Sequence, residues 1–130
     1  MSLAVSSNPK DNDVEVRLLD QEQITEFGRL NNRLLELRAE KKQAKTDMDK
    51  LDDANTELEL VIGGKVMLFI GESFVETDED YAKEYCEKKI KELGASIDTL
   101  KIEEEQIVNR QDSLKKILYA RFGDAINLEN

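Results

Sequence analysis

The sequence contains no histidine, no tryptophan, one proline and one cysteine, and aromatic residues make up only 5% of its 130 residues. Without histidine, a Ser–His triad, a Cys–His pair or a His-bearing zinc site cannot form. The single cysteine, Cys86, excludes an intrachain disulfide and fits a reducing compartment. Gly63-Gly64-Lys65 is too short for a phosphate loop, and the acidic run at 76–80 lacks the spacing of a calcium loop. We expect no enzyme, no cofactor and no metal site.

Long apolar runs and an excess of positive charge are also missing. No stretch approaches the ~18 consecutive apolar residues that a membrane span requires. Residues 1–13 lack the basic start and the apolar run of a signal peptide. The formal net charge of −10 disfavours binding to nucleic acid or to an anionic membrane surface. We therefore expect a soluble cytoplasmic protein with no nucleic-acid or membrane partner.

Charged residues, at 37% of the chain, surround two long heptad repeats. Apolar residues sustained at two positions of a heptad over four repeats are typical of coiled coils. The first repeat has Phe27, Leu34, Lys41, Met48 and Asn55 at one position and Leu30, Leu37, Ala44, Leu51 and Leu58 at the other. The second has Ile90, Ile97, Glu104, Gln111 and Leu118 at one position and Cys86, Leu93, Leu100, Ile107 and Leu114 at the other.

The repeats predict two helices, over about residues 20–62 and 78–122, within one domain of residues 14–130. Asp20 followed by Gln23 predicts the start of the first helix, and Thr77 followed by Asp80 predicts a capping box for the second. Neither helix can bury its apolar stripe alone, and the connection between them is short. We therefore expect a mainly α fold, a long antiparallel two-helix coiled coil.

The connection itself predicts a single β-hairpin over about residues 65–76, because two β-prone runs flank Gly71-Glu72. A lone hairpin is marginally stable in water, and this one is strongly apolar. Pairing with hairpins of other subunits would cover its edges. We expect oligomerisation through Val66, Leu68, Phe69, Ile70, Phe74 and Val75.

The two ends of the chain differ in character. Residues 1–13 have little periodicity and predict a flexible N-terminal tail. The C-terminal tail, residues 123–130, continues an apolar stretch that begins at Ile117. Chain ends are normally polar and disordered. This one is expected to fold back into a core or to hold another molecule.

The terminal sequence LYARFGDAINLE (118–129) resembles the C-terminal signature of the subunit 4 branch of the β-type prefoldin subunits. FGRLNNRL (27–34) and LDDANTELEL (51–60) resemble the first helix of the same branch, and IGESF (70–74) resembles its hairpin. The similarity runs from about Asp20 to Glu129. The single hairpin places the chain among β-type rather than α-type subunits.

The resemblance implies a subunit of a hetero-hexamer with two α-type and four β-type subunits, whose hairpins assemble into a β-barrel platform. It implies an ATP-independent chaperone that holds unfolded client proteins, notably nascent actin and tubulin. The clients are then passed to the cytosolic group II chaperonin.

In an antiparallel arm the start of the first helix and the end of the second meet at the tip. Exposed apolar groups there can bind unfolded chains with little sequence preference. The candidate client-binding residues are Val16, Leu19, Ile24, Phe27, Leu118, Tyr119, Phe122, Ile126 and Leu128. Two alternatives remain open. Ile24, Phe27 and Leu118 could complete the coiled-coil seam, and the last four could fold back locally.

A second class of function also fits the pattern, a structural coiled-coil adaptor or spacer that oligomerises through its hairpin. A coiled-coil arm of a larger enzyme is a third alternative. The apolar tip and the prefoldin-like terminus favour the chaperone, because a spacer has no need of apolar groups at its end.

Overall fold

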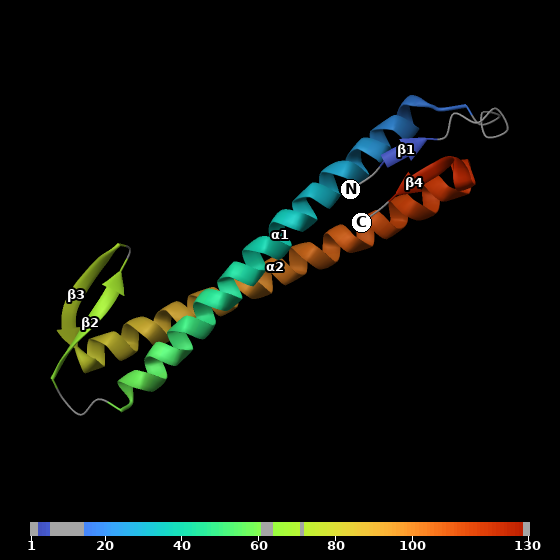
Figure 1. Ribbon diagram of the computed structural model, residues 1–130. Coiled ribbons are helices and arrows are strands. Elements are labelled where there is room, and N and C mark those ends of the chain that lie inside the picture. Colours follow the sequence, from blue (N-terminus) through green and yellow to red (C-terminus); the bar gives the residue numbers. More distant parts are fainter. Residues whose placement is uncertain (1–2, 6–14, 61–63, 71, 129–130) are drawn as a thin grey trace. The chain divides into compact units, whose positions relative to one another are not determined.

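The computed structural model describes residues 3–5, 15–60, 64–70 and 72–128, and it contains both expected helices and the hairpin (Figure 1). Helix α1 spans Leu18–Leu58 and helix α2 spans Glu79–Phe122. Between them lie strands β2 (Lys65–Ile70) and β3 (Ser73–Asp78). A 3₁₀ turn, η1 (Gly123–Ala125), follows α2, and strands β1 (Leu3–Val5) and β4 (Ile126–Leu128) come from opposite ends of the chain. The mainly α fold class, two long helices joined by one β-hairpin, is confirmed.

Burial along the helices follows the predicted heptads, since none of their twenty positions is exposed. The chain divides into two compact units, Met1–Ala39 with Lys101–Asn130 and Glu40–Leu100. In the first unit most heptad positions between the helices are buried, and Leu34, Leu37 and Leu114 are almost completely so. In the second unit the heptad positions between residues 41 and 55 and between residues 90 and 100 are only partly buried.

Ion pairs within the first unit show that the helices run antiparallel. Glu26 on α1 accepts two hydrogen bonds from Arg110 on α2, at 2.6 and 2.9 Å. Further along α1, Arg33 pairs with Glu103 at 2.9 Å, so the partner position falls as the α1 position rises. The Arg110 guanidinium also lowers the pKa of Glu26 below its usual range. Such surface pairs add little stability, about 0–1 kcal/mol each, and their main effect is on register.

A buried polar pair lies in the same seam. The amide of Gln111 donates a 3.5 Å hydrogen bond to Asn31, and both side chains are almost completely buried. Changing Asn31→Leu alone should destabilise the first unit by about 1–3 kcal/mol, because Gln111 is left without its partner. Changing both residues to leucine should be close to neutral. Urea unfolding of the two single variants and the double variant measures this coupling, and equal, additive losses would contradict it.

The helix starts differ from the predicted caps by a few residues. Helix α1 begins at Leu18, so Asp20 is in its first turn, where its carboxylate accepts the backbone N–H of Arg17 at 2.9 Å. That is the reverse half of a capping box rather than an N-cap. At α2 the cap is Asp78, whose carboxylate accepts the N–H of Tyr81 at 2.8 Å, and the predicted Thr77–Asp80 box is wrong. An Asp in either position complements the positive end of the helix dipole.

Strands β2 and β3 form the predicted hairpin in the second unit, paired antiparallel from Lys65↔Asp78 to Ile70↔Ser73. The second strand extends to Asp78, two residues beyond the predicted end. The side chain of Val66 packs against a small cluster of Leu58, Ala82 and Cys86 from the two helices, which we call the hairpin cluster. The hairpin is therefore anchored on the helices along one face.

The two chain ends meet in the first unit, where β1 and β4 pair antiparallel with Leu3 opposite Leu128 and Val5 opposite Ile126 (Figure 1). Leu3–Val5, within the tail expected to be flexible over 1–13, form strand β1, and the rest of that tail lies outside the described residues. The C-terminal tail turns at Gly123, whose φ of 56° is in the left-handed region that favours glycine. The fold-back alternative for the C-terminus is the one observed.

Candidate functional site

The last residues of the chain complete a buried core with the start of α1. We call this core the terminal cluster, and it consists of Phe27, Leu114, Leu118, Phe122, Ala125, Ile126 and Leu128, with Ile24 and Leu30 packed against it. Of the nine predicted client-binding residues, five are members of this cluster. They lie inside the folded unit rather than on its surface. Their role in binding other chains stays a prediction, and their structural role is core packing.

The remaining predicted residues are more accessible. Leu19 is half exposed, and Val16 and Tyr119 are also exposed, whereas Ile24 is only partly so. Two neighbours outside the predicted client-binding set, Leu18 and Ile117, are exposed as well. A helix that begins with two adjacent leucines cannot turn both toward a partner helix, which is the signal that could have identified Leu18.

Arg121 of α2 holds this exposed segment in place. Its guanidinium donates to the backbone carbonyl of Glu15 at 2.7 Å and contacts the carboxylate of Asp20 at 2.9 Å. These two contacts lie on either side of residues 16–19. The exposed apolar residues at the start of α1 are therefore fixed against the end of α2, next to the terminal cluster.

Asp20 is the buried centre of this contact. Its side chain is 0% exposed and also accepts hydrogen bonds from the Arg17 guanidinium at 3.0 and 3.3 Å. The Arg17 hydrogen bonds, together with the nearby charge of the Arg121 guanidinium, hold the pKa of Asp20 well below its usual range, although burial opposes the shift. The charge is fully paired, which is the condition for burying a carboxylate at acceptable cost. Sequence pattern alone did not reveal this bridge, because Arg121 is about one hundred residues away from Asp20.

The Asp20 bridge should make the stability of the first unit pH dependent. The carboxylate has a lower pKa in the folded chain than its unfolded value of about 3.9, so its contribution is complete above that pH and is lost as the pH falls further. At pH 7 Asp20→Asn should cost about 1.5–3 kcal/mol, the usual loss for a hydrogen bond to a charged group.

Thermal unfolding followed between pH 7 and pH 2.5 tests this expectation. The difference in unfolding temperature between the original chain and Asp20→Asn should become smaller as the pH falls below about 4. Asp112→Asn, at an exposed position of α2, is the matched control and should change little at any pH. A gap that is constant over the whole range would contradict the bridge.

Tyr119 fixes the C-terminal strand onto α2. The backbone N–H of Leu128 donates to the Tyr119 hydroxyl at 3.0 Å, and this hydroxyl donates to the Leu128 carbonyl at 3.3 Å. One side chain thus satisfies both main-chain groups of a residue on the edge of β4. For Tyr119 the sequence left client contact and folding back as alternatives, and the hydroxyl holds the folded-back C-terminal strand.

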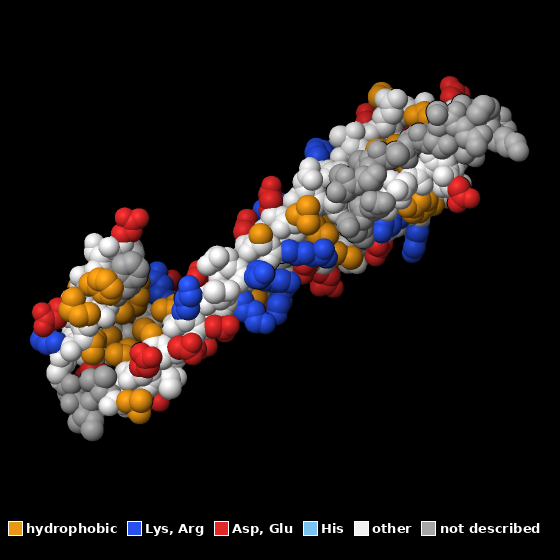
Figure 2. Space-filling view, viewed as in Figure 1, with side chains coloured by type: hydrophobic (Ala, Val, Ile, Leu, Met, Phe, Trp, Pro, Cys, Tyr) orange, Lys and Arg blue, Asp and Glu red, His pale blue; other side chains and the backbone are white. Residues whose placement is uncertain are grey.

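The hairpin offers a second exposed apolar surface, in the second unit. Met67 and Phe74 are 62% and 66% exposed, and Val75 is also exposed. Figure 2 shows hydrophobic side chains gathered over the hairpin. Phe69 and Ile70 belong to β2 by their backbone pairing, with Phe69 opposite Phe74, and their side chains lie outside the described part. Of the predicted oligomerisation residues, Val66 and Leu68 are partly buried toward the helices. The hairpin therefore has an anchored face and an exposed apolar face.

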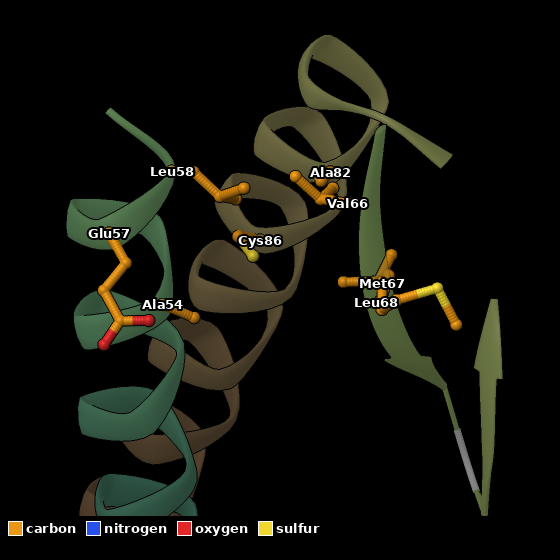
Figure 3. Close-up of a pocket in the computed structure, with 8 residues that line it drawn as sticks. All are labelled: Ala54, Glu57, Leu58, Val66, Met67, Leu68, Ala82 and Cys86. Carbon is orange, nitrogen blue, oxygen red and sulfur yellow. The ribbon is translucent and has the colours of Figure 1, made fainter. Parts of the chain in front are cut away.

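A recess of about 240 Å³ opens between the hairpin and the two helices (Figure 3). Its lining is mostly aliphatic, and Met67 extends away from the helices at its rim. Cys86 is buried in this lining, and burial together with the nearby Glu87 carboxylate raises the pKa of its thiol. A raised pKa disfavours the reactive thiolate, so the recess is suited to packing an apolar group rather than to chemistry.

Over residues 3–5, 15–60, 64–70 and 72–128, no group of three or more Cys, Asp or Glu side chains is arranged to hold a metal ion. In the same part of the chain, neither helix is long and apolar enough to cross a membrane.

Comparison with known proteins agrees with this architecture. The prefoldin subunit family matches residues 21–125 of the sequence. A probable prefoldin subunit 4 from Dictyostelium discoideum is 37% identical over 118 residues, which cover 90% of this chain and 89% of that protein. Prefoldin subunit 4 from Saccharomyces cerevisiae is 34% identical and covers 91% of this chain and 92% of its own length. The human prefoldin subunit 4 is also 34% identical, over 90% of this chain and 89% of that protein.

The fold has a counterpart among solved structures. The crystal structure of the prefoldin beta subunit from Thermococcus strain KS-1 superposes with a TM-score of 0.72, at 16% identity, over 84% of this chain and 96% of that one. Two long helices with a single hairpin between them define the chain as a coiled-coil protein of the prefoldin beta type. The chain belongs to the prefoldin subunit family, as the resemblance in its C-terminal motif indicated. A chaperone role and association with other prefoldin subunits follow from that membership.

Proposed function

We propose that this chain is an ATP-independent holdase subunit of a cytoplasmic prefoldin hetero-hexamer with two α-type and four β-type subunits. It captures unfolded client proteins, such as nascent actin and tubulin, at the surface beside the terminal cluster. It then delivers them to the cytosolic group II chaperonin. The hairpins join the subunits through a β-barrel platform, and no nucleotide takes part.

The exposed apolar segment at the start of α1 is the observation that carries the proposal. Leu18 and Leu19 are 71% and 50% exposed, yet Arg121 and Asp20 hold their segment in a defined position. Unfolded chains expose apolar side chains, and burial of such groups contributes about 25 cal/mol per Å². One small surface binds weakly, and several arms of a hexamer acting together raise the avidity.

A client-holding assay on the assembled complex tests the proposal. Leu18→Ser with Leu19→Ser should reduce the ability of the complex to suppress aggregation of a chemically denatured protein. The matched control is Leu35→Ser with Ile102→Ser, at positions that are 56% and 59% exposed on α1 and α2. The control should retain suppression, and both variants should still assemble. Full suppression by the Leu18/Leu19 variant would contradict this location of the client site.

The adaptor alternative gives a different result in the same assay. An adaptor that only joins other proteins through its hairpin has no use for Leu18 and Leu19. The complex would then fail to suppress aggregation with or without the substitutions.

A further inference from the structure

Strand β4 has two edges, and each is occupied by a different part of the chain. The N–H and C=O of Leu128 point toward α2, where both bond to the Tyr119 hydroxyl. Because successive residues of a strand direct these groups to opposite edges, those of Asn127 point the other way. On that side lies β1, with Ala4 opposite Asn127.

The side chains of β4 fix this strand in place independently of β1. Ile126 and Leu128 are buried in the terminal cluster, and Asn127 between them is exposed. With Tyr119 bound to its inner edge, β4 is held by α2 and by the core. Its outer edge is therefore a ready template for an extended segment.

We propose that the outer edge of β4 is a docking site for an extended apolar segment of an unfolded client, and that β1 occupies this site as a built-in competitor. The inference rests on the proposed holding function and adds the mode of binding and its control. In strand pairing the hydrogen bonds are made to the backbone of the bound segment rather than to its side chains. That recognition suits clients that share no sequence.

The chain itself shows what the edge accepts. The occupant is Leu3-Ala4-Val5, a short extended apolar segment like those that an unfolded protein exposes. A client segment and β1 need the same groups of Asn127, so only one of them pairs at a time. Because β1 is part of the same chain, its effective concentration at the edge is on the order of millimolar. A client must exceed that competition, which it does through a longer segment or through contacts with several subunits.

Binding of a labelled peptide to the assembled complex tests the competition. The probe is a fluorescent peptide with the sequence of residues 1–7, followed by fluorescence anisotropy. Ala4→Pro removes the N–H that faces Asn127 and should release β1, so the peptide should bind about tenfold more tightly. Ser7→Pro introduces the same residue outside β1 and should leave the affinity unchanged. Equal affinity in Ala4→Pro and in the original complex would overturn the inference.

Two further variants guard against an indirect effect. Deletion of residues 1–5 should produce the same gain as Ala4→Pro, because it removes the competitor outright. Adding Asn127→Pro to the deletion should abolish the gain, since the edge then lacks its N–H, while circular dichroism checks that the helices remain. A gain that persists with Asn127→Pro would place the peptide elsewhere and overturn the inference.

Aggregation suppression by the same complexes separates this inference from the function on which it rests. Suppression that is intact in every variant, together with unchanged peptide affinity, overturns strand docking and leaves the holdase in place. Peptide affinity that rises in Ala4→Pro, in complexes that suppress no aggregation, supports the docking edge and contradicts the holdase.

Discussion

Replacing Met67 and Phe74 with aspartate should abolish assembly with other prefoldin subunits while leaving the chain folded. Both side chains are largely exposed on the hairpin, and the contacts that anchor the hairpin come from Val66 on its other face. Burying two such side chains at an interface contributes on the order of 3–6 kcal/mol, which corresponds to a factor of about 10²–10⁴ in affinity. Aspartates in their place would add the cost of burying charge.

Size-exclusion chromatography with mass detection would measure this loss after co-expression with the partner subunits. The control carries aspartate at Leu35 and Ile102, which are similarly exposed apolar positions outside the hairpin. It should assemble normally, and circular dichroism should show the same helix content in both variants. A hairpin variant that still enters the complex would show that assembly uses another surface.

Phe27→Ala should have the largest effect on stability of any single substitution in the first unit, about 3–5 kcal/mol. Phe27 is 0% exposed and belongs to the terminal cluster together with Leu118 and Phe122 of α2. Its removal leaves a cavity that the rigid helix backbones can fill only in part. The substitution also removes contacts that position the start of α1 and the end of α2.

Denaturant unfolding of the isolated chain measures the loss, with Leu35→Ala as the exposed counterpart on the same helix. Leu35→Ala should change the free energy of unfolding by no more than about 0.5 kcal/mol, as is usual for surface substitutions. A small effect at Phe27 would mean that the terminal cluster contributes little to the folded state. It would return Phe27 to the set of possible client contacts.

The parts of the fold that repeat along the chain were predictable from the sequence. The contact line between the helices was predictable because the same apolar pattern recurs in every heptad. For that reason the predicted burial of Leu34, Leu37 and Leu114 was correct. The hairpin was predictable because two short β-prone runs flank Gly71-Glu72. Both signals are local, so no long-range contact was needed to read them.

The terminal site depended on contacts that a local pattern does not contain. Pairing of β1 with β4 joins residues from opposite ends of the chain, and three residues such as Leu-Ala-Val are too few for a strand signal. The Asp20–Arg121 bridge and the Tyr119–Leu128 clamp likewise depend on where helix ends meet. The apolar residues were recognised correctly, but whether Phe122 or Ile126 faced the core or the surface could be decided only in three dimensions.

The measurement that tests the central claim most directly is the mass and composition of the native assembly. The tagged chain would be purified gently from its own cells, and native mass spectrometry would weigh and identify what accompanies it. The account predicts a complex of six small coiled-coil subunits, two of them of the α type. A homodimer, or a single large unrelated partner, would contradict it and favour the adaptor.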